Sequence, residues 1–381
     1  MNSFEKLIIN EPHSKNENDK NLLFKKALVD NFEHHYNNCE PYRNLCDSRG
    51  WHLPLNTDFK LEDFPYLPIE IFKNMSLRST KNSKIIKTLK SSATSQQTPS
   101  TIFLDKETSK RQMQTLIWFL SNRLGKNRRP FIVMDLDPND ISDKQNTITA
   151  RTAAVRGFLT ASSSYNYCMK QEKSGEMHID LEKFEKLLKE TQNSDDKIVI
   201  FGYTFVFYIY VAQELKKRGV RFKLQNATIL HIGGWKKLQS QSTDKETFNQ
   251  TMIDVFGVER HNIIDCYGFT EQLGVVYLDG KDGLKRTSEV SEIIVRDQKT
   301  LLPCEDGKEG LLEFISPLPL SYPGNAILTD DIGKIISREK GNDGRTGVAF
   351  EILGRRPKAE IRGCGDILSE SIFNKKNDEI L

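Results

Sequence analysis

The spacing of the hydrophobic positions along the chain changes near residue 89. Before that point, apolar side chains recur at helical intervals, which predicts an amphipathic helix. These side chains are Leu22, Leu23, Phe24, Leu28, Phe32 and Tyr36. Pro41 ends or interrupts the pattern, and the two prolines within 63–74 indicate an extended connector. We therefore expect residues 1–88 to form a helical segment packed on the core.

Between about residues 89 and 350, short apolar runs alternate with amphipathic stretches. The runs are rich in β-branched residues and end in turn signals, which predicts strands at 130–138, 157–165, 197–202, 227–234, 262–268, 274–280, 291–297 and 310–316. Helical spacing predicts helices at 109–125, 181–192, 205–219 and 245–257. This alternation favours a layered, largely parallel α/β architecture, in which ligands bind beyond the C-terminal ends of the strands. Residues 351–381 are expected to form a short C-terminal segment.

Charge and hydropathy exclude two classes of protein. The 381 residues carry 55 Lys and Arg against 52 Asp and Glu, and the basic residues form no stripe, which argues against a nucleic-acid partner. The longest uncharged stretch, 198–213, is shorter than the roughly 20 residues of a membrane-spanning helix. It fits a buried strand that runs into a buried helix, so we expect no transmembrane segment.

Six cysteines lie far apart, and no two of them form a C-x-x-C pair. This spacing argues against a zinc knuckle and against a disulfide scaffold. The N-terminus lacks the cationic start and the apolar run of a signal peptide. We therefore expect a cytoplasmic protein with reduced thiols, any of which can act as a nucleophile.

Four polar segments lie beside predicted strands, and two of them come early. The first is the hydroxyl-rich run 90–100, which contains no phosphate-loop lysine motif but whose hydroxyls and N–H groups can wrap a polyphosphate. A plain polar loop is the alternative. The second is Gly233 with Gly234, where the backbone can approach a flat ligand closely, or where the strand simply turns.

The other two segments carry carboxylates. Segment 265–271 places an aromatic ring, a glycine, a hydroxyl and a carboxylate at the end of a strand, a set that can stack a base, touch a phosphate and hold Mg²⁺. A capped turn with a solvated glutamate is the alternative. Segment 329–333, with 354–356, offers a carboxylate for two ribose hydroxyls and an arginine for the same sugar or phosphate. Each piece alone is common on protein surfaces.

Taken in order, the four segments resemble the adenylate-forming enzyme superfamily. The runs SSATSQQTPSTIFLD, HIGGWKKL, CYGFTEQ and RGCG resemble more closely the acyl-protein synthetases of the LuxE type, over about residues 64–367. The resemblance implies an α/β domain like the N-terminal domain of adenylate-forming enzymes, with a truncated C-terminal region. It also implies an ATP- and Mg²⁺-dependent ligase that activates a long-chain fatty acid as acyl-adenylate, takes the acyl group onto its own cysteine and passes it to an acyl reductase of bacterial luminescence.

The resemblance also assigns roles to individual residues. The loop over the β- and γ-phosphates would contain Ser91, Ser92, Thr94 and Ser95. Gly233 and Gly234 would border the adenine, and Tyr267 would stack on it. Thr270 would contact the α-phosphate and Glu271 the Mg²⁺ ion. Asp331 and Arg355 would contact the ribose. Cys364 would carry the acyl group, whereas Cys266 reads as a core residue. His231 either sits over the acyl carboxylate or is a satisfied buried histidine.

Three departures from the family pattern leave alternatives open. Ala93 and Gln96 stand where the phosphate loop usually has glycines, so a catalytically degenerate binding subunit is one alternative. The sequence Asp330-Asp331 leaves open which aspartate holds the ribose. The resemblance implies that the mobile C-terminal domain and its lysine are absent, and the candidates for neutralising pyrophosphate are Lys87, Lys90 and Lys358. Acyl transfer to coenzyme A or to a carrier protein is a further alternative.

Overall fold

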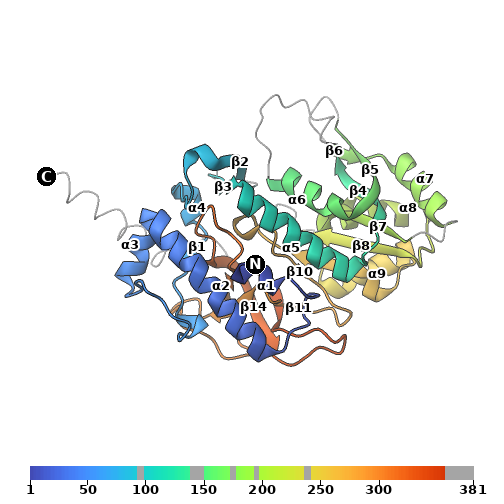
Figure 1. The fold of residues 1–381 in the computed structure, drawn as a ribbon. Helices are drawn as coiled ribbons and strands as arrows, with labels where there is room; N and C mark the ends of the chain where they lie inside the picture. The colour runs from blue at the N-terminus through green and yellow to red at the C-terminus, as the bar shows by residue number, and fades with distance from the viewer. Residues whose placement is uncertain (92–97, 138–149, 172–176, 193–196, 236–241, 357–381) are drawn as a thin grey trace.

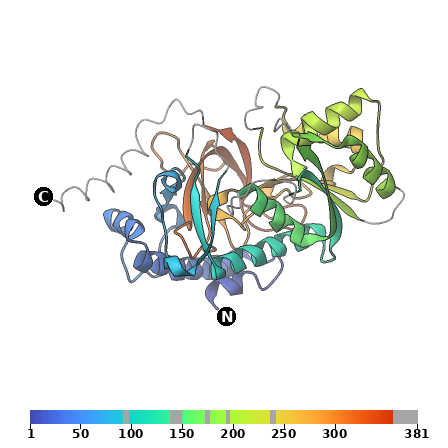
Figure 2. The same cartoon turned by 90° about the horizontal axis from the view of Figure 1, so that it is seen from above.

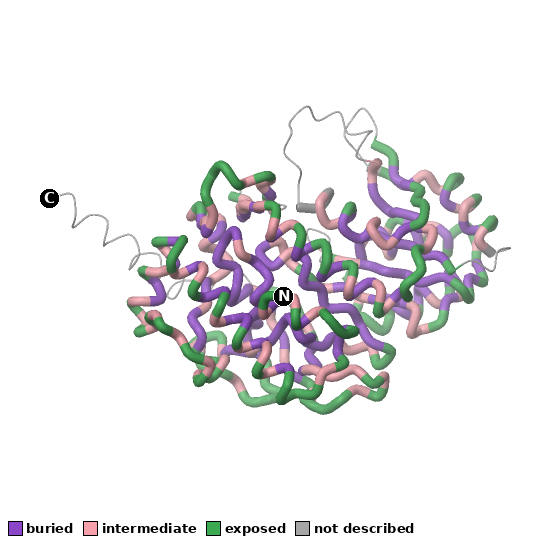
Figure 3. Tube along the Cα trace, in the orientation of Figure 1, coloured by how far each residue is buried: buried purple, intermediate pink, exposed green. Residues whose placement is uncertain are grey.

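The computed structural model describes residues 1–91, 98–137, 150–171, 177–192, 197–235 and 242–356. Two large sheets lie side by side, as Figures 1 and 2 show from two directions. The buried positions follow the strands and the inner faces of the helices (Figure 3). Among the described residues, no helix has the length and apolar character needed to cross a membrane.

The first sheet has seven strands and confirms the predicted parallel architecture. Its strands, in spatial order, are β10 (Tyr277–Leu278), β9 (Ile263–Tyr267), β8 (Ala227–Ile232), β7 (Ile198–Tyr203), β4 (Arg129–Leu136), β5 (Ser162–Gln171) and β6 (Met177–Ile179). The inner strands β9, β8, β7, β4 and β5 are parallel, while β10 and β6 pair antiparallel at the edges.

Helices cover both faces of this sheet because successive strand residues point to opposite sides. Val199 and Phe201 pack in the same hydrophobic cluster as α5 and α6, whereas Ile200 packs in the cluster of α7, α8 and α9. The helices are α5 (Lys106–Leu124), α6 (Ala150–Phe158), α7 (Leu181–Gln192), the π-helix η4 (Val206–Ala212), α8 (Gln213–Lys217) and α9 (Lys245–Phe256). The uncharged stretch 198–213 is thus a buried strand followed by a helix, as predicted.

The second sheet has six strands, and most of its pairs are antiparallel. In spatial order they are β11 (Lys285–Arg286), β15 (Ala349–Arg355), β14 (Ala326–Ser337), β13 (Gly310–Ile315) and β12 (Glu292–Arg296), with β1 (Leu67–Pro68) parallel to β14. The sequence analysis predicts β12 and β13 but not the long β14. The polar motif at 329–331 lies inside this strand.

The N-terminal segment is helical, as expected, and packs on the second sheet. It contains α1 (Ser3–Leu7), α2 (Glu17–Asn38), α3 (Glu40–Ser48), the short turns η1 (Leu61–Asp63) and η2 (Asn82–Lys84), and α4 (Ile71–Asn74). The expected connector at 63–74 therefore holds both a strand and a helical turn. The hairpin β2 (Ile85–Lys90) and β3 (Thr101–Asp105) follows it. The expected boundaries near residues 88 and 350 fall inside β2 and β15.

Two predicted strands differ from the structure. Residues 157–161 end α6 and form the 3-10 turn η3 (Leu159–Ala161), so the strand starts only at Ser162. Gly157 lies on the helix surface, where a Cβ would come within 2.7 Å of Leu116 on α5, so the glycine permits close helix packing rather than a strand. Of the predicted strand 274–280, only Tyr277 and Leu278 pair with β9.

Candidate active site

Tyr267, Asp331 and Arg355 form one hydrogen-bonded group that joins the two sheets. Tyr267 ends β9, and its hydroxyl donates to Oδ2 of Asp331 on β14 at 2.6 Å. Nε of Arg355, the last residue of β15, donates to Oδ1 of the same carboxylate at 3.1 Å. The register of the second sheet places Asp331 directly opposite Arg355. The structure therefore brings together three residues that the sequence assigned to one nucleotide.

The ring of Tyr267 has one face occupied. Phe314 of β13 stacks on it, with ring centroids 5.4 Å apart and planes at 29°. Burial, followed by the charge of Asp331, raises the pKa of the Tyr267 hydroxyl well above its usual range. The hydroxyl is therefore a neutral donor near pH 7, and a base can stack only on the face of the ring opposite Phe314.

Asp330 and Asp331 have different surroundings although they are adjacent on β14. Asp330 lies 4.0 Å from Nη2 of Arg356 and hydrogen bonds with the carboxyl group of Glu70. Burial and this neighbour raise the pKa of Glu70 to about 7. Only Asp331 contacts Tyr267, which favours Asp331 over Asp330 as the residue that faces the nucleotide.

Glu271 lies at the base of the hydroxyl-rich segment. It belongs to the turn η7 (Thr270–Gln272), is only 3% exposed, and accepts a hydrogen bond from the Ser100 hydroxyl. Ser91 and Ser100 face each other across the hairpin: the Ser91 N–H donates to the Ser100 carbonyl, and the Ser100 N–H donates to the Ser91 hydroxyl, each at 2.9 Å. Ser92, Thr94 and Ser95, with Ala93 and Gln96, lie outside the described residues.

The carboxylate of Glu271 suits a hard cation. Burial raises its pKa, so ionising it in place costs free energy that a nearby cation would offset. Magnesium is commonly held by one or two carboxylates together with phosphate oxygens, and therefore does not need a protein-only cage. In the part of the chain that the structure describes, no group of three or more His, Cys, Asp or Glu residues could form such a cage.

His231 and the glycine pair end the neighbouring strand β8. The Thr204 hydroxyl donates to the Gly233 carbonyl at 2.6 Å and lies 2.8 Å from Nδ1 of His231. Burial lowers the pKa of His231 to about 4, so the ring is neutral near pH 7. Gly233 has φ +75°, a conformation that favours glycine, and a Cβ on Gly234 would meet no described atom within 4 Å. Thr204 thus fixes both the histidine and the turn.

An ion-pair network lies behind this edge of the sheet, and its lysines belong to no motif that sequence analysis could single out. Nζ of Lys285 on β11 lies 2.7 Å from a carboxylate oxygen of Asp265 and 2.7 Å from one of Asp279. Lys245 also contacts Asp279, at 2.6 Å. Although burial opposes its ionisation, Lys285 holds the pKa of Asp265 far below the usual range. The network therefore links β11 of the second sheet to Asp265 of β9, which lies two residues before Tyr267.

Replacing Lys285 with methionine is expected to lower the free energy of unfolding by about 2–3 kcal/mol, less than the loss for a fully buried ion pair. The change takes the ammonium partner from Asp265, whose side chain is 30% exposed, whereas the buried Asp279 keeps Lys245. Urea unfolding at pH 7 measures the loss. Lys281→Met, at an exposed position of the same turn, is the matched control and should change the unfolding free energy by less than about 0.5 kcal/mol. Equal losses in the two variants would contradict the role of the network.

The cysteines differ in their surroundings. Cys266 is 3% exposed, and burial raises the pKa of its thiol, which confirms its interpretation as a core residue. Cys364 lies outside the described residues. Three lysines were candidates for neutralising pyrophosphate. Burial, and then the charge of Arg156, lower the pKa of Lys87. Lys90 is exposed at the end of β2, and Lys358 lies outside the described residues.

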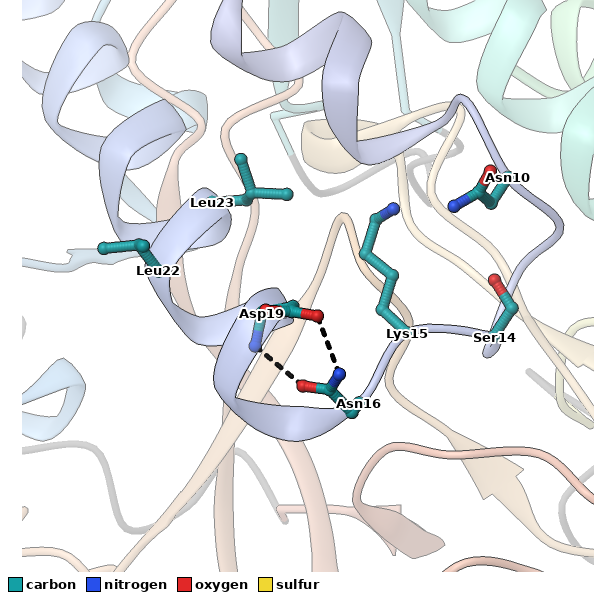
Figure 4. Close-up of a pocket in the computed structure, with 7 residues that line it drawn as sticks. All are labelled: Asn10, Ser14, Lys15, Asn16, Asp19, Leu22 and Leu23. Atoms are coloured by element: carbon teal, nitrogen blue, oxygen red, sulfur yellow. Dashed lines mark hydrogen bonds between the residues drawn. The ribbon is translucent and has the colours of Figure 1, made fainter.

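A shallow hollow near the start of α2 is not part of this site. It is lined by Asn10, Ser14, Lys15, Asn16, Asp19, Leu22 and Leu23, none of which is a candidate site residue. Figure 4 shows that Asn16 and Asp19 bond to each other there, as the N-terminal cap of the helix. These two polar side chains of the hollow therefore serve the helix end.

Nearly the whole chain matches one family of known proteins. Residues 2–373 match the family described as acyl-protein synthetase, LuxE. The chain is similar to the long-chain-fatty-acid–luciferin-component ligase of Aliivibrio fischeri, with 27% identity over 89% of this chain and 86% of that protein. The corresponding ligase of Vibrio harveyi is 25% identical over 94% of this chain and 90% of that protein.

A solved structure shares the fold. The open conformation of 2-hydroxyisobutyryl-CoA ligase, in complex with 2-HIB-AMP and CoA, superposes with a TM-score of 0.66 at 11% identity. The similarity covers 93% of this chain and 78% of that chain. The two-sheet arrangement is thus an adenylate-forming ligase fold.

Proposed function

Because the chain belongs to the LuxE family of acyl-protein synthetases and is a ligase, we propose that it activates a long-chain fatty acid with ATP and carries the acyl group on its own cysteine. One observation supports this proposal most directly. Tyr267 and Arg355, from two different strands, both donate hydrogen bonds to the carboxylate of Asp331 on a third strand. The name of the relatives, fatty-acid ligase, supports the same class of substrate.

In the first step, a carboxylate oxygen of the fatty acid attacks the α-phosphorus of ATP. The bond between that phosphorus and the bridging oxygen breaks, and its electron pair leaves with pyrophosphate. Asp331 accepts hydrogen bonds from the ribose hydroxyls. The adenine stacks on the face of Tyr267 opposite Phe314, and the turn at Gly233 and Gly234 borders the adenine. Thr270 contacts the α-phosphate. Holding these groups in place lowers the barrier because the reactants no longer lose orientational freedom on the way to the transition state.

Two acidic or basic groups assist this step. Glu271, buried beside Ser100, would hold Mg²⁺, which when bound neutralises part of the triphosphate charge. Neutral His231 would lie over the acyl carboxylate without adding charge of its own. Ser91 would contact the phosphates at the base of the loop, next to Ser100, with Ser92, Thr94 and Ser95 along the loop.

In the second step, the thiolate of Cys364 attacks the acyl carbonyl carbon. The carbon–oxygen bond to AMP breaks, AMP leaves with the electron pair, and a thioester forms. Transfer of the acyl group to the thiol of an acyl reductase would complete the sequence. The family description, acyl-protein synthetase, supports a protein as the acceptor.

Exchange of labelled pyrophosphate into ATP tests the first step. The wild-type protein should show exchange that requires both Mg²⁺ and a fatty acid, and that changes with the length of the acid. Rapid consumption of coenzyme A or of a carrier-protein thiol would instead indicate a different acceptor for the second step. No exchange with any acid would contradict the proposal and would favour a binding subunit that has lost activity.

A further inference from the structure

Thr204 lies where two neighbouring parallel strands end. It is the first residue after β7, and Gly233 is the first residue after β8. Tyr203 and Ile232 are the last pair in the register of these strands. Beyond that pair, the Thr204 hydroxyl donates to the Gly233 carbonyl at 2.6 Å, and the Ile232 carbonyl lies 3.3 Å from the same hydroxyl. One side chain therefore continues the contact between the strands as far as the glycine turn.

The same hydroxyl determines which nitrogen of His231 carries the hydrogen. Oγ1 of Thr204 lies 2.8 Å from Nδ1 of His231, and a hydroxyl has a single hydrogen to donate. If Nδ1 accepted that hydrogen, the Thr204 oxygen and the Gly233 carbonyl oxygen would face each other at 2.6 Å with no hydrogen between them. The hydroxyl therefore donates to the carbonyl, and Nδ1 donates its own hydrogen to Thr204. Because a neutral imidazole carries one N–H, Nε2 is an acceptor.

Two further neighbours of His231 support this arrangement. Oδ1 of Asp265 lies 3.8 Å from Nδ1, and its negative charge favours a hydrogen on that nitrogen. Phe248 of α9 packs on the imidazole, with ring centroids 4.5 Å apart, and so restricts rotation of the ring. Thr204 and His231 are both buried, so bulk water would not replace a hydrogen bond that either side chain lost.

We propose that Thr204 is a positioning residue of the active site, a role that rests on the proposed function. Its hydroxyl holds the Gly233 turn that borders the adenine, and it keeps His231 in the tautomer whose Nε2 has a lone pair. Nε2 therefore offers the acyl carboxylate no hydrogen, and His231 does not bind the acid by donating from that nitrogen. Sequence analysis did not assign a role to Thr204 because the stretch 198–213 showed only a buried strand and helix.

NMR of protein labelled with ¹⁵N-histidine tests the tautomer directly. In the wild type, Nδ1 of His231 should resonate as a protonated nitrogen and Nε2 as an unprotonated one. His231→Gln identifies these signals among those of the seven histidines. Thr204→Val keeps the shape of the side chain but removes the hydroxyl, so it should move the population toward the form with the hydrogen on Nε2, whereas Thr204→Ser should keep the wild-type pattern. A wild-type His231 with its hydrogen on Nε2 would overturn the inference.

Pyrophosphate exchange measures the effect on function. Thr204→Val should raise the KM for ATP about 10-fold, because the Gly233 carbonyl loses its donor, and the KM for the fatty acid by less than about twofold. A general loss of structure would not give this difference, and Thr204→Ser should restore the KM for ATP. Thr228→Val is the matched control: Thr228 is also buried, lies near the start of β8 and contacts Arg129, so its exchange should equal that of the wild type.

The two assays separate this inference from the proposed function. A wild-type protein without exchange would contradict the proposed function, yet the spectra of the wild type and of Thr204→Val would still decide whether Thr204 sets the tautomer of His231. An unchanged His231 spectrum in Thr204→Val, or equal KM values for ATP in that variant and in the wild type, would overturn the inference.

Discussion

Replacing Cys364 with serine is expected to abolish the transfer of the acyl group to the protein. A serine hydroxyl is almost fully protonated near pH 7 and is a far weaker nucleophile than a cysteine thiolate, so the acyl-adenylate would form but would not be captured. Incubation with labelled tetradecanoic acid, ATP and Mg²⁺ followed by denaturing gel electrophoresis measures the label. On the wild-type protein the label should be released by hydroxylamine, as a thioester is.

Cys304→Ser is the matched control for this experiment. Cys304 is partly exposed, whereas Cys39, Cys46, Cys168 and Cys266 are buried. The Cys304→Ser protein should take up as much label as the wild type, and pyrophosphate exchange should persist in both variants. Full labelling of the Cys364→Ser protein would show that Cys364 does not carry the acyl group.

Replacing Asp331 with asparagine is expected to lower the rate of pyrophosphate exchange about 100- to 1000-fold. The carboxylate accepts hydrogen bonds from both Tyr267 and Arg355, and the amide would remove the charge that holds Arg355 and that, under the proposed function, would accept hydrogen bonds from the ribose hydroxyls. The change keeps the size of the side chain, so the strand should pair as before. Initial rates over a range of ATP concentrations measure the effect.

Asp330→Asn is the control because it alters the neighbouring carboxylate on the same strand. Its partners are Glu70 and Arg356, not the Tyr267 group, so exchange should fall less than about tenfold. A second comparison, Tyr267→Phe, removes only the hydroxyl and keeps the ring. Equal losses at Asp330 and Asp331 would show that the contact with Tyr267 does not select the functional aspartate.

The parallel half of the fold could be predicted because its signals are local. Strands such as β7 and β8 are continuous apolar runs with glycine or polar residues at their ends, and amphipathic helices follow them. The prediction of a strand over the whole of 157–165 was wrong because a short apolar run does not distinguish a helix end from a strand. Here the close approach of α6 to α5 decides in favour of the helix.

The antiparallel sheet was harder to predict because its signals are not local. The sequence of β14 contains two aspartates and Gly333, which resemble a loop, yet the strand pairs with β13 along one edge and with β15 along the other. A Cβ on Gly333 would come within 2.2 Å of the Glu351 carbonyl of β15, so the glycine allows the two strands to pair closely. That requirement arises from the next strand, β15, and it leaves no mark in the residues around Gly333.

The candidate site was predictable only where its residues form contiguous motifs. Segments 265–271 and 329–331 contain Tyr267 and Asp331, and their contact joins the C-terminal end of β9 to the middle of β14, not to a strand end. Lys285 lies in a segment without a motif, and it pairs with two carboxylates that only the folded chain brings near. Isolated charged residues carry no periodic signal, so sequence reasoning could not assign them.

The pairing of β1 with β14 also bears on how the protein is made. Leu67 aligns with Ile327, so the N-terminal helices leave the ribosome long before their partner strand has been synthesised. During that interval the N-terminal segment lacks the sheet on which it packs in the finished protein, and Phe32 has only partners of its own segment, such as Tyr42 and Phe64. The packing of this segment is thus completed only late in translation, which exposes its apolar side chains to aggregation until then.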